Sequence, residues 1–480
     1  MPKILLVNPP TRTAKEECCS GVQDSLFIPA QPILSCAYLR SQGFDVDFID
    51  ARVQKLSLDG YNVVVSWASV FDSLYDDIKV LSKAKLYGAK TIVILNDPYE
   101  TLEEELLLHF SFIDVAIRLW DRERTLARVL RAILSGNDEL KRIRGIVFRK
   151  GKQVIDTGKS SQPQDLSHLI DSSSILGELP LEKYDEGWVL SGKGCPYRCT
   201  FCLYRVTKHL SRNPKYVANE LETMYAAGID SVYVLDLNLL MAPLFAKNLA
   251  HEIVKRKINI SWRTDARVEH CSKELLAELS RSGLSELIIG IESADPNVLI
   301  KIMKDLKLNI VFKAYENCNM FEIRPTFHYM YGFPWDDSAS AMRIVKLANA
   351  LAYAKHSVNW VRPLIGTPLY DQMLKFNVVP QLSLDDYVNR RALSRRTLKL
   401  STYDLVRNFV FILANLDYLN DRSFSSYIAA NFFDLSNKFI DKVKIPSVIK
   451  CFMHYLSLPF VQDIPQIPKH ISFWKTNHDN

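Results

Sequence analysis

Three cysteines stand at a spacing that could hold a metal cluster. Cys195, Cys199 and Cys202 form the pattern C-x3-C-x2-C, directly after a short apolar run. Three thiolates on one short loop can bind three corners of an iron–sulfur cluster, because sulfur is the ligand that such clusters prefer. The fourth corner then has no protein ligand, and an open position is typical of a catalytic metal site. The pattern therefore predicts a catalytic cluster on this loop.

The same cysteines allow two other interpretations. With His209 nearby, they could hold a structural zinc ion. They could also be unligated core cysteines, since free cysteine is often buried. The chain has nine cysteines in 480 residues, and the remaining six, among them Cys18 and Cys19 in an expected loop, show no second cluster. An odd, scattered set is a poor disulfide framework, so we expect a reducing, cytoplasmic setting.

The first 157 residues are expected to form one α/β domain. Short apolar runs alternate with helical segments, which is typical of buried parallel strands with crossover helices. The expected strands are 3–8, 45–49, 61–65 and 91–95, the expected helices 32–41 and 73–86, and a hairpin at 145–155 closes the domain. This pattern predicts a doubly wound, Rossmann-like parallel sheet whose ligands lie beyond the carboxyl ends of the strands.

A second alternating series follows a linker at 158–186. Its expected strands are 188–191, 231–235, 259–262, 286–291, 325–331 and 359–363. Asn213, Ser272 and Asp295 are expected to cap helices, two of them followed by Pro at the first helical position. Six strands with crossover helices predict a partial (β/α)6 TIM-like barrel over 187–379, with its site at the carboxyl ends of the strands. Residues 380–480 are expected to form a mostly helical, aromatic-rich region.

The cysteine pattern and several later motifs resemble those of the radical S-adenosylmethionine (SAM) superfamily. Gly290-Ile291-Glu292-Ser293 is similar to that superfamily's fourth-strand motif, and Gly332-Phe333-Pro334 is similar to its fifth. Thr264–Leu276 resembles the exit of its third strand. Val7-Asn8-Pro9-Pro10 and the sixth-strand ending Pro363–Tyr370 resemble the cobalamin (B12)-binding subgroup. The resemblance covers about residues 1 to 380.

This resemblance implies roles for individual residues. The three cysteines would hold a [4Fe-4S] cluster, whose fourth iron would bind the amino and carboxylate groups of S-adenosylmethionine. Phe201 and Gly332 would lie at the adenine, and Glu292 and Ser293 at the ribose or methionine part. The remaining candidates are Asp236 at the end of the second strand, Arg267 as a clamp for the SAM carboxylate, and Ser66 and Ser69 near a cobalamin nucleotide tail.

The first domain departs from the subgroup where cobalamin would bind. The subgroup usually has Gly-Gly-Pro-His-like residues after the fourth strand, but this chain has Leu95-Asn96-Asp97-Pro98-Tyr99. After the fifth strand, Leu119-Trp120-Asp121-Arg122 replaces a Gly-Glu-Gly-Glu-like segment. A Cβ atom at these positions would intrude where backbone must lie against the corrin. The sequence therefore leaves cobalamin binding open.

Together these features predict an enzyme that cleaves SAM reductively and modifies a small molecule or natural product. Methyl transfer is expected if cobalamin binds, and rearrangement, cyclisation or another SAM-derived group transfer if it does not. The rival interpretation is a non-catalytic zinc or iron–sulfur protein. The resemblance also implies an electron donor such as flavodoxin or ferredoxin.

Charge and hydropathy limit the other partners. The net charge of +6 comes from 60 basic and 54 acidic residues without a basic block, so nucleic-acid binding is not expected. The apolar stretch 408–419 is shorter than the roughly 20 residues that cross a bilayer. A membrane-surface enzyme, docking through 409–419 or 450–460, stays open as a further alternative.

Overall fold

The computed structural model describes residues 2–10, 26–68, 74–95, 102–118, 121–136, 139–383, 386 and 397–421. Several predictions fall outside these residues. They concern Cys18, Cys19 and Ser69, the segments 96–99 and 119–120, and most of the C-terminal region, including 450–460.

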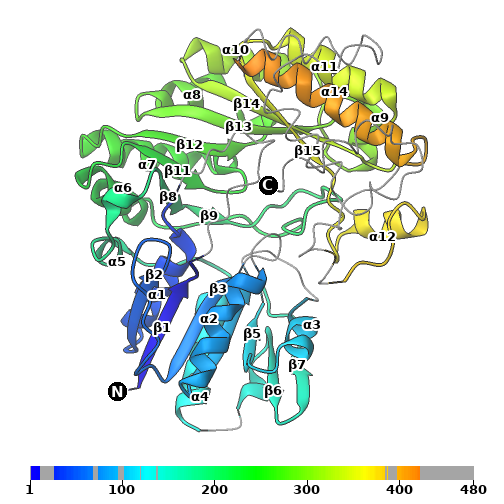
Figure 1. Ribbon diagram of the computed structural model, residues 1–480. Helices are drawn as coiled ribbons and strands as arrows, with labels where there is room; N and C mark the ends of the chain where they lie inside the picture. The colour runs from blue at the N-terminus through cyan, green and yellow to red at the C-terminus, as the bar shows by residue number, and fades with distance from the viewer. Residues whose placement is uncertain are drawn as a thin grey trace, which may run out of the picture.

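The N-terminal part is a seven-stranded sheet in the order β2-β1-β3-β4-β5-β6-β7 (Figure 1). Its strands are β1 (Lys3–Asn8), β2 (Asp45–Asp50), β3 (Val63–Ala68), β4 (Lys90–Leu95), β5 (Val115–Ile117), β6 (Ile146–Lys150) and β7 (Gln153–Asp156). The helices are α1 (Ala30–Ser41), α2 (Leu74–Leu86), α3 (Leu102–His109) and α4 (Arg122–Leu134). Strands β1 to β5 pair in parallel, in the order 2-1-3-4-5 of a doubly wound fold. The Rossmann-like prediction is confirmed.

The hairpin joins this sheet with the opposite sense. Strand β6 pairs antiparallel with both β5 and β7. The tight turn Gly151–Lys152 reverses the chain between β6 and β7, whereas β6 follows β5 through helix α4 and still runs antiparallel to it. Residues 158–186, expected as a linker, contain the short α5 (Ser173–Leu176) and pack closely: Leu166, Leu169 and Ile175 are all buried.

The second part is a six-stranded, wholly parallel sheet in the order β8-β11-β12-β13-β14-β15. The strands are β8 (Gly187–Leu190), β11 (Ser231–Leu235), β12 (Ser261–Ala266), β13 (Leu284–Glu292), β14 (Arg324–Tyr331) and β15 (Lys355–Trp360). The helices are α6 (Pro214–Ala226), α7 (Pro243–Lys255), α8 (Lys273–Ser280), α9 (Pro296–Lys301), α10 (Asn309–Met320), α11 (Ser338–Ala350) and α12 (Pro368–Lys375). Within the described residues β8 and β15 do not pair, so the barrel is open, as predicted.

Alternating exposure shows which side chains face the barrel interior. Along β11 and β12, Tyr233, Leu235, Arg263 and Asp265 are half-buried, while the residues between them are buried against the outer helices. The three expected caps are confirmed, because Asn213, Ser272 and Asp295 each accept a backbone N–H at a helix start. The sixth strand was expected at 359–363, but β15 ends at Trp360. Its first half, Lys355-His356-Ser357, is polar, so no apolar run marks where the strand begins.

The described C-terminal helix lies beside the barrel wall. Helix α14 (Thr402–Asp421) runs next to α11 and β15 (Figure 1). Phe409 packs on Trp360 with ring centroids 4.9 Å apart, and Asn408 donates to the Tyr331 hydroxyl at 3.0 Å. Phe409 and Ile412, which belong to the stretch considered for membrane docking, are buried against this wall. None of the helices described is long and apolar enough to cross a bilayer.

Candidate active site

The cysteine loop follows β8 and is closed at its base. The short strands β9 (Gly192–Lys193) and β10 (Leu210–Ser211) pair antiparallel on either side of it. Gly194 takes a φ of 91°, and a Cβ there would overlap the carbonyl of Lys208. Only glycine meets both demands easily. The Cys195 N–H donates to the Thr207 hydroxyl at 2.8 Å, and the Cys195 carbonyl accepts from the Thr207 N–H. These two hydrogen bonds hold the ends of the loop together.

The three thiols are arranged for a cluster rather than for one zinc ion. All three are free, with Cys199 buried and the others half-buried. Tetrahedral zinc with bonds of about 2.3 Å brings its sulfur ligands to within about 3.8 Å of one another. Among the described residues, the cysteines and His209 are not in any set of three such groups whose donor atoms lie within 4.8 Å. A [4Fe-4S] cluster, with one thiolate on each of three irons, fits this wider spacing.

His209 has another partner. Its Nε2 lies 2.9 Å from Asp236 Oδ1, and the Asp236 carboxylate also accepts from the Asn238 N–H and the Ser191 hydroxyl. Asp236 thus ties the ends of β8 and β11 together with the base of the cysteine loop. The predicted Asp236 therefore lies next to the cysteine loop, and both of its carboxylate oxygens form hydrogen bonds.

Glu292 is aimed into the site by an irregular strand end. Strand β13 has a register shift between Gly290 and Glu292, and Glu292 takes a φ of 66°. A positive φ is costly for a residue with a side chain and is often found at functional sites. The carboxylate folds back over Gly290, where a Cβ would overlap it, and accepts from Lys304 Nζ at 2.9 Å. Gly290 is therefore required by the position of Glu292.

Lys304 was missed by sequence reasoning. Its side chain is 6% exposed, and its ammonium lies on the carboxylate of Glu292. The sequence offers Lys301, Lys304 and Lys307 at equal intervals after the fourth-strand motif, so spacing alone could not single it out.

Arg267 lies under the cysteine loop. Its guanidinium stacks on the Tyr197 ring at 3.8 Å, and its Nη1 lies 3.7 Å from Cys199 Sγ. The Nη2 of Arg267 donates to the Glu269 carboxylate and to the Lys304 carbonyl. The structure thus brings the predicted Arg267 to the cluster sulfur, with its charge already paired. By contrast, Arg263 forms a bidentate ion pair with Glu186.

Two buried polar atoms near Cys199 have no hydrogen-bond partner among the described residues. They are Thr200 Oγ1 and Arg267 Nε. Orphaned buried groups are rare in proteins and are typical of a site that completes its hydrogen bonds with a ligand. Together with the three thiols and the folded-back Glu292, they fit a cluster with SAM bound beside it.

The other predicted SAM residues gather at the same strand ends. Phe201 lies against Phe333, with ring centroids 6.1 Å apart. Gly332 takes a φ of 108°, and its N–H and that of Phe333 both donate to buried Asp336. Ser293 is 1% exposed, and its hydroxyl accepts the Asp295 N–H, so it is used in starting α9.

His328 and Tyr329 take opposite sides of β14. Tyr329 is fully buried on the helix side, whereas half-buried His328 faces the barrel interior opposite Gly290. In the described part of the chain, no hydrogen bond is found for the His328 side chain. Burial lowers the pKa of His328.

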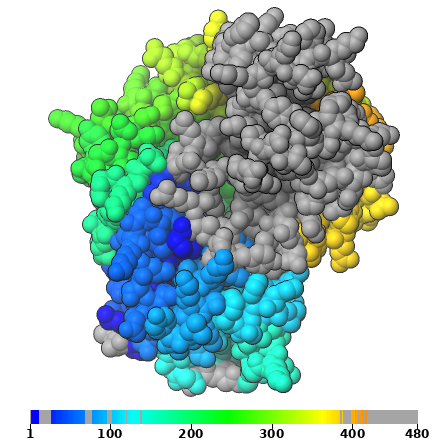
Figure 2. All heavy atoms as spheres, in the orientation of Figure 1, coloured from blue at the N-terminus to red at the C-terminus, as the bar shows by residue number. Residues whose placement is uncertain are grey.

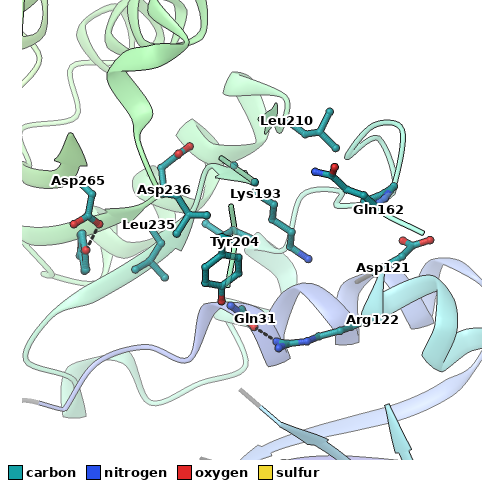
Figure 3. Close-up of a pocket in the computed structure, with 16 residues that line it drawn as sticks. Gln31, Asp121, Arg122, Gln162, Lys193, Tyr204, Leu210, Leu235, Asp236 and Asp265 are labelled. Carbon is teal, nitrogen blue, oxygen red and sulfur yellow. Dashed lines mark hydrogen bonds between the residues drawn. The ribbon is translucent and has the colours of Figure 1, made fainter. Parts of the chain in front are cut away.

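A cavity of about 250 Å³ lies between the two parts of the molecule (Figure 3). The first part contributes Gln31, Asp121 and Arg122, from the starts of α1 and α4. The barrel contributes the ends of β8, β11 and β12 and the residues around the cysteine loop. The cavity therefore lies beside the cluster loop, where the two sets of strand ends meet. Figure 2 shows the N-terminal residues in blue and cyan packed directly against the green barrel.

An ion pair bridges the two parts at the edge of this cavity. Lys193, two residues before Cys195, donates to fully buried Glu123 at 2.9 Å. His168 lies 3.4 Å from the same carboxylate. Because of Lys193 and His168, the pKa of Glu123 is lowered despite its burial. Ser66, predicted near cobalamin, is fully buried within β3 and donates to the Trp67 carbonyl at 3.2 Å.

Comparisons with known proteins agree with this geometry. Residues 189–348 match the family model described as Radical SAM superfamily. The chain is 25% identical over 410 residues to an uncharacterized methyltransferase, PH0819, of Pyrococcus horikoshii, covering 80% of this chain and 86% of that one. It is 24% identical over 387 residues to the bacteriochlorophyllide d C-12(1)-methyltransferase of Chlorobaculum tepidum, covering 77% and 78%.

Solved structures share the whole architecture. The radical SAM methyltransferase TsrM from Kitasatospora setae, with cobalamin and a [4Fe-4S] cluster bound, superposes with a TM-score of 0.66 at 16% identity, covering 88% of this chain and 89% of that one. The cobalamin-dependent radical SAM enzyme OxsB superposes with a TM-score of 0.70 at 14% identity, covering 97% and 76%. By its cysteine loop, its strand-end motifs and the match over residues 189–348, the chain is similar to the radical SAM superfamily, and it shares its fold with solved radical SAM enzymes that bind cobalamin.

Proposed function

We propose that the chain is a radical SAM methyltransferase acting on a small organic molecule. The observation that carries this proposal is the position of the three-thiol loop, with one open cluster corner, beside an interdomain cavity of small-molecule size. Two relatives that align over most of their length are named methyltransferases, which supports methyl transfer as the outcome.

The chain's own residues divide the work. Cys195, Cys199 and Cys202 would hold the cluster, and the Arg267 guanidinium, which is paired with Glu269, would lie beside the Cys199 thiolate. Glu292, held by Lys304, offers its carboxylate to the cationic or hydroxyl groups of SAM. When bound, the cluster and SAM supply a 5′-deoxyadenosyl radical after one-electron reduction. The cavity walls exclude water and stray hydrogen donors, which would otherwise quench a primary carbon radical.

The electron is proposed to come from a small carrier such as flavodoxin or ferredoxin. Cobalamin is the proposed methyl carrier, because the N-terminal sheet presents its carboxyl edge to the barrel.

Cyclisation without methyl transfer is a second candidate. The chain is 26% identical over 207 residues to an anaerobic magnesium-protoporphyrin IX monomethyl ester cyclase of Synechocystis, which covers 41% of this chain and 40% of that one. The missing Gly-Gly after β4 also favours a reaction that needs no corrin.

Isotope transfer separates the two. The enzyme is reconstituted anaerobically with iron and sulfide, supplied with hydroxocobalamin and CD3-labelled SAM, and incubated with a low-molecular-weight metabolite extract. We expect products carrying a CD3 group in mass spectra, and none with Cys199→Ala. Cys36→Ala, a buried cysteine of α1, is the matched control and should retain labelling. Formation of 5′-deoxyadenosine without any labelled product would instead support cyclisation.

A further inference from the structure

Of the residues expected at SAM, Asp236 lines the interdomain cavity and the others do not. None of Phe201, Glu292, Ser293 or Gly332 lines it, and none of the three cysteines does. Its walls come from the opposite half of the barrel, β8, β11 and β12, and from the N-terminal domain. This is the position that a second reactant would take next to the cluster loop.

Most charged groups in the cavity wall already have partners in the chain. Lys193 is bound to Glu123, Arg122 donates to Gln31 at 2.7 Å, and Asp236 holds His209. Asp121 lies 3.5 Å from His168 and 3.7 Å from Arg124, although its buried Oδ1 has no hydrogen-bond partner among the described residues. Each of these four side chains therefore already has a polar or charged neighbour within the protein.

Asp265 is the exception. Among the described residues it forms no salt bridge, and its one hydrogen bond is accepted by Oδ2 from the Tyr233 hydroxyl. Figure 3 shows its carboxylate on the barrel side of the cavity, near Leu235 and Asp236. Arg263, two residues before it in β12, forms an ion pair with Glu186 and stacks on the Tyr233 ring at 4.7 Å.

The surroundings of Asp265 favour a cation as its missing partner. Burial, together with the charges of Asp236 and Glu292, raises the pKa of Asp265 to about 7, although the hydrogen bond from Tyr233 and the charge of Arg263 act in the opposite direction. A partly buried carboxyl among other acids is costly to ionise alone, but a ligand N–H cation removes that cost. Charge-assisted hydrogen bonds are also stronger than neutral ones.

The rest of the wall is apolar. Leu190, Leu210, Leu235 and Leu237, with Pro163, cover much of it. Such a surface binds hydrocarbon by burial, while one polar group fixes orientation.

We propose that this cavity is the substrate pocket and takes an organic amine, with its ammonium on Asp265 and its hydrocarbon body on the leucines. The identification of the pocket as a substrate site rests on the proposed function. Asp265 would thereby set specificity, since a neutral analogue of the same shape leaves its carboxylate without a partner.

A pair of probes tests this in the reconstituted enzyme saturated with SAM. 3-Phenylpropylamine and its neutral analogue 3-phenylpropan-1-ol are titrated at neutral pH, and binding is followed by calorimetry and saturation-transfer NMR. We expect the amine to bind at least tenfold more tightly than the alcohol. Asp265→Asn, which keeps the shape, should weaken the amine at least tenfold and leave the alcohol unchanged. Asp59→Asn, an exposed carboxyl of the first domain, is the matched control and should change neither.

Equal binding of the two probes to the wild-type enzyme, no measurable binding of the amine, or an unchanged amine affinity in Asp265→Asn would each overturn the proposal. The comparison of the probes on the wild-type enzyme needs no variant, so a misfolded variant does not remove the test. An enzyme that forms 5′-deoxyadenosine but does not prefer the amine would leave the proposed function standing. An enzyme that prefers the amine but never cleaves SAM would support the amine pocket and contradict the proposed function.

Discussion

At the scale of single residues, the motifs predicted which strand ends carry the candidate site but not the contacts among its side chains. The cysteines, Glu292, Gly332 and Phe201 meet at the strand ends where sequence analysis expected them. Lys304 and the turn of Arg267 toward Cys199 were not predictable, because both depend on how the loop after α9 folds back onto the cysteine loop. Side-chain partners that come from different elements leave no fixed spacing in the sequence.

Replacing Gly290 with Ala should damage SAM binding selectively. The new Cβ would overlap the Glu292 carboxylate and push it off Lys304. We expect the dissociation constant for SAM to rise at least tenfold, with the cluster absorbance unchanged, as measured by equilibrium dialysis. Gly177→Ala, where a Cβ meets its nearest neighbour at 3.6 Å, is the control. Tight SAM binding by Gly290→Ala would show that Glu292 is not a SAM ligand.

Asp265 should make stability depend on pH. Burial raises its folded-state pKa to about 7, whereas an unfolded Asp titrates near about 4. The folded protein therefore holds this proton longer, so the stabilising contribution is full below about pH 4 and is lost as the pH rises to about 7. The apparent melting temperature of the wild type minus that of Asp265→Asn should fall between pH 5 and pH 8. A constant difference would mean that Asp265 is already ionised at pH 5.

At the scale of elements, periodicity and capping residues predicted most helices and strands. The apolar runs of β1, β4 and β11 and the caps Asn213 and Ser272 were placed to within a residue or two. Strand β15 was misplaced because its first half is polar, and polar strands at a sheet edge give no hydrophobic pattern. The tight turn explains the antiparallel sense of β7 against β6, but the antiparallel pairing of β6 with β5, which α4 connects, could not be predicted from the sequence.

The ion pair between β9 and α4 should matter more than a surface pair of the same length. Lys193→Met leaves the fully buried Glu123 with only His168 beside it, and breaking a buried pair typically costs about 3–5 kcal/mol. Hydrogen exchange should become faster at both β9 and the start of α4. Lys399→Met removes the exposed Lys399–Asp337 pair of 2.8 Å and should leave the stability nearly unchanged. Similar effects of the two variants would show that Glu123 is hydrated.

At the scale of the whole molecule, the order of the two α/β units could be predicted from the sequence, but the surface on which they pack could not. Two α/β units with strand ends as sites were evident from the alternation of elements. The cavity between Gln31, Arg122 and the barrel depends on how the units dock, and ion pairs such as Arg40–Glu178 that hold them have no sequence signature.

Cobalamin retention tests the N-terminal unit as a whole. Because Asn96-Asp97 stands where the subgroup has Gly-Gly, we expect hydroxocobalamin to be held weakly and lost on gel filtration. The measurement is the corrin absorbance of the protein peak. Stoichiometric retention would show that the missing glycines do not obstruct the corrin.

The central claim is that the cysteine loop holds a cluster that cleaves SAM. The most direct measurement is 5′-deoxyadenosine formed by the anaerobically reconstituted, reduced enzyme, together with its visible spectrum. The account predicts a brown protein that forms 5′-deoxyadenosine from SAM, and a Cys199→Ala variant that has lost both properties. A colourless protein carrying one zinc ion after reconstitution, or a Cys199→Ala variant that cleaves SAM as well as the wild type, would contradict it.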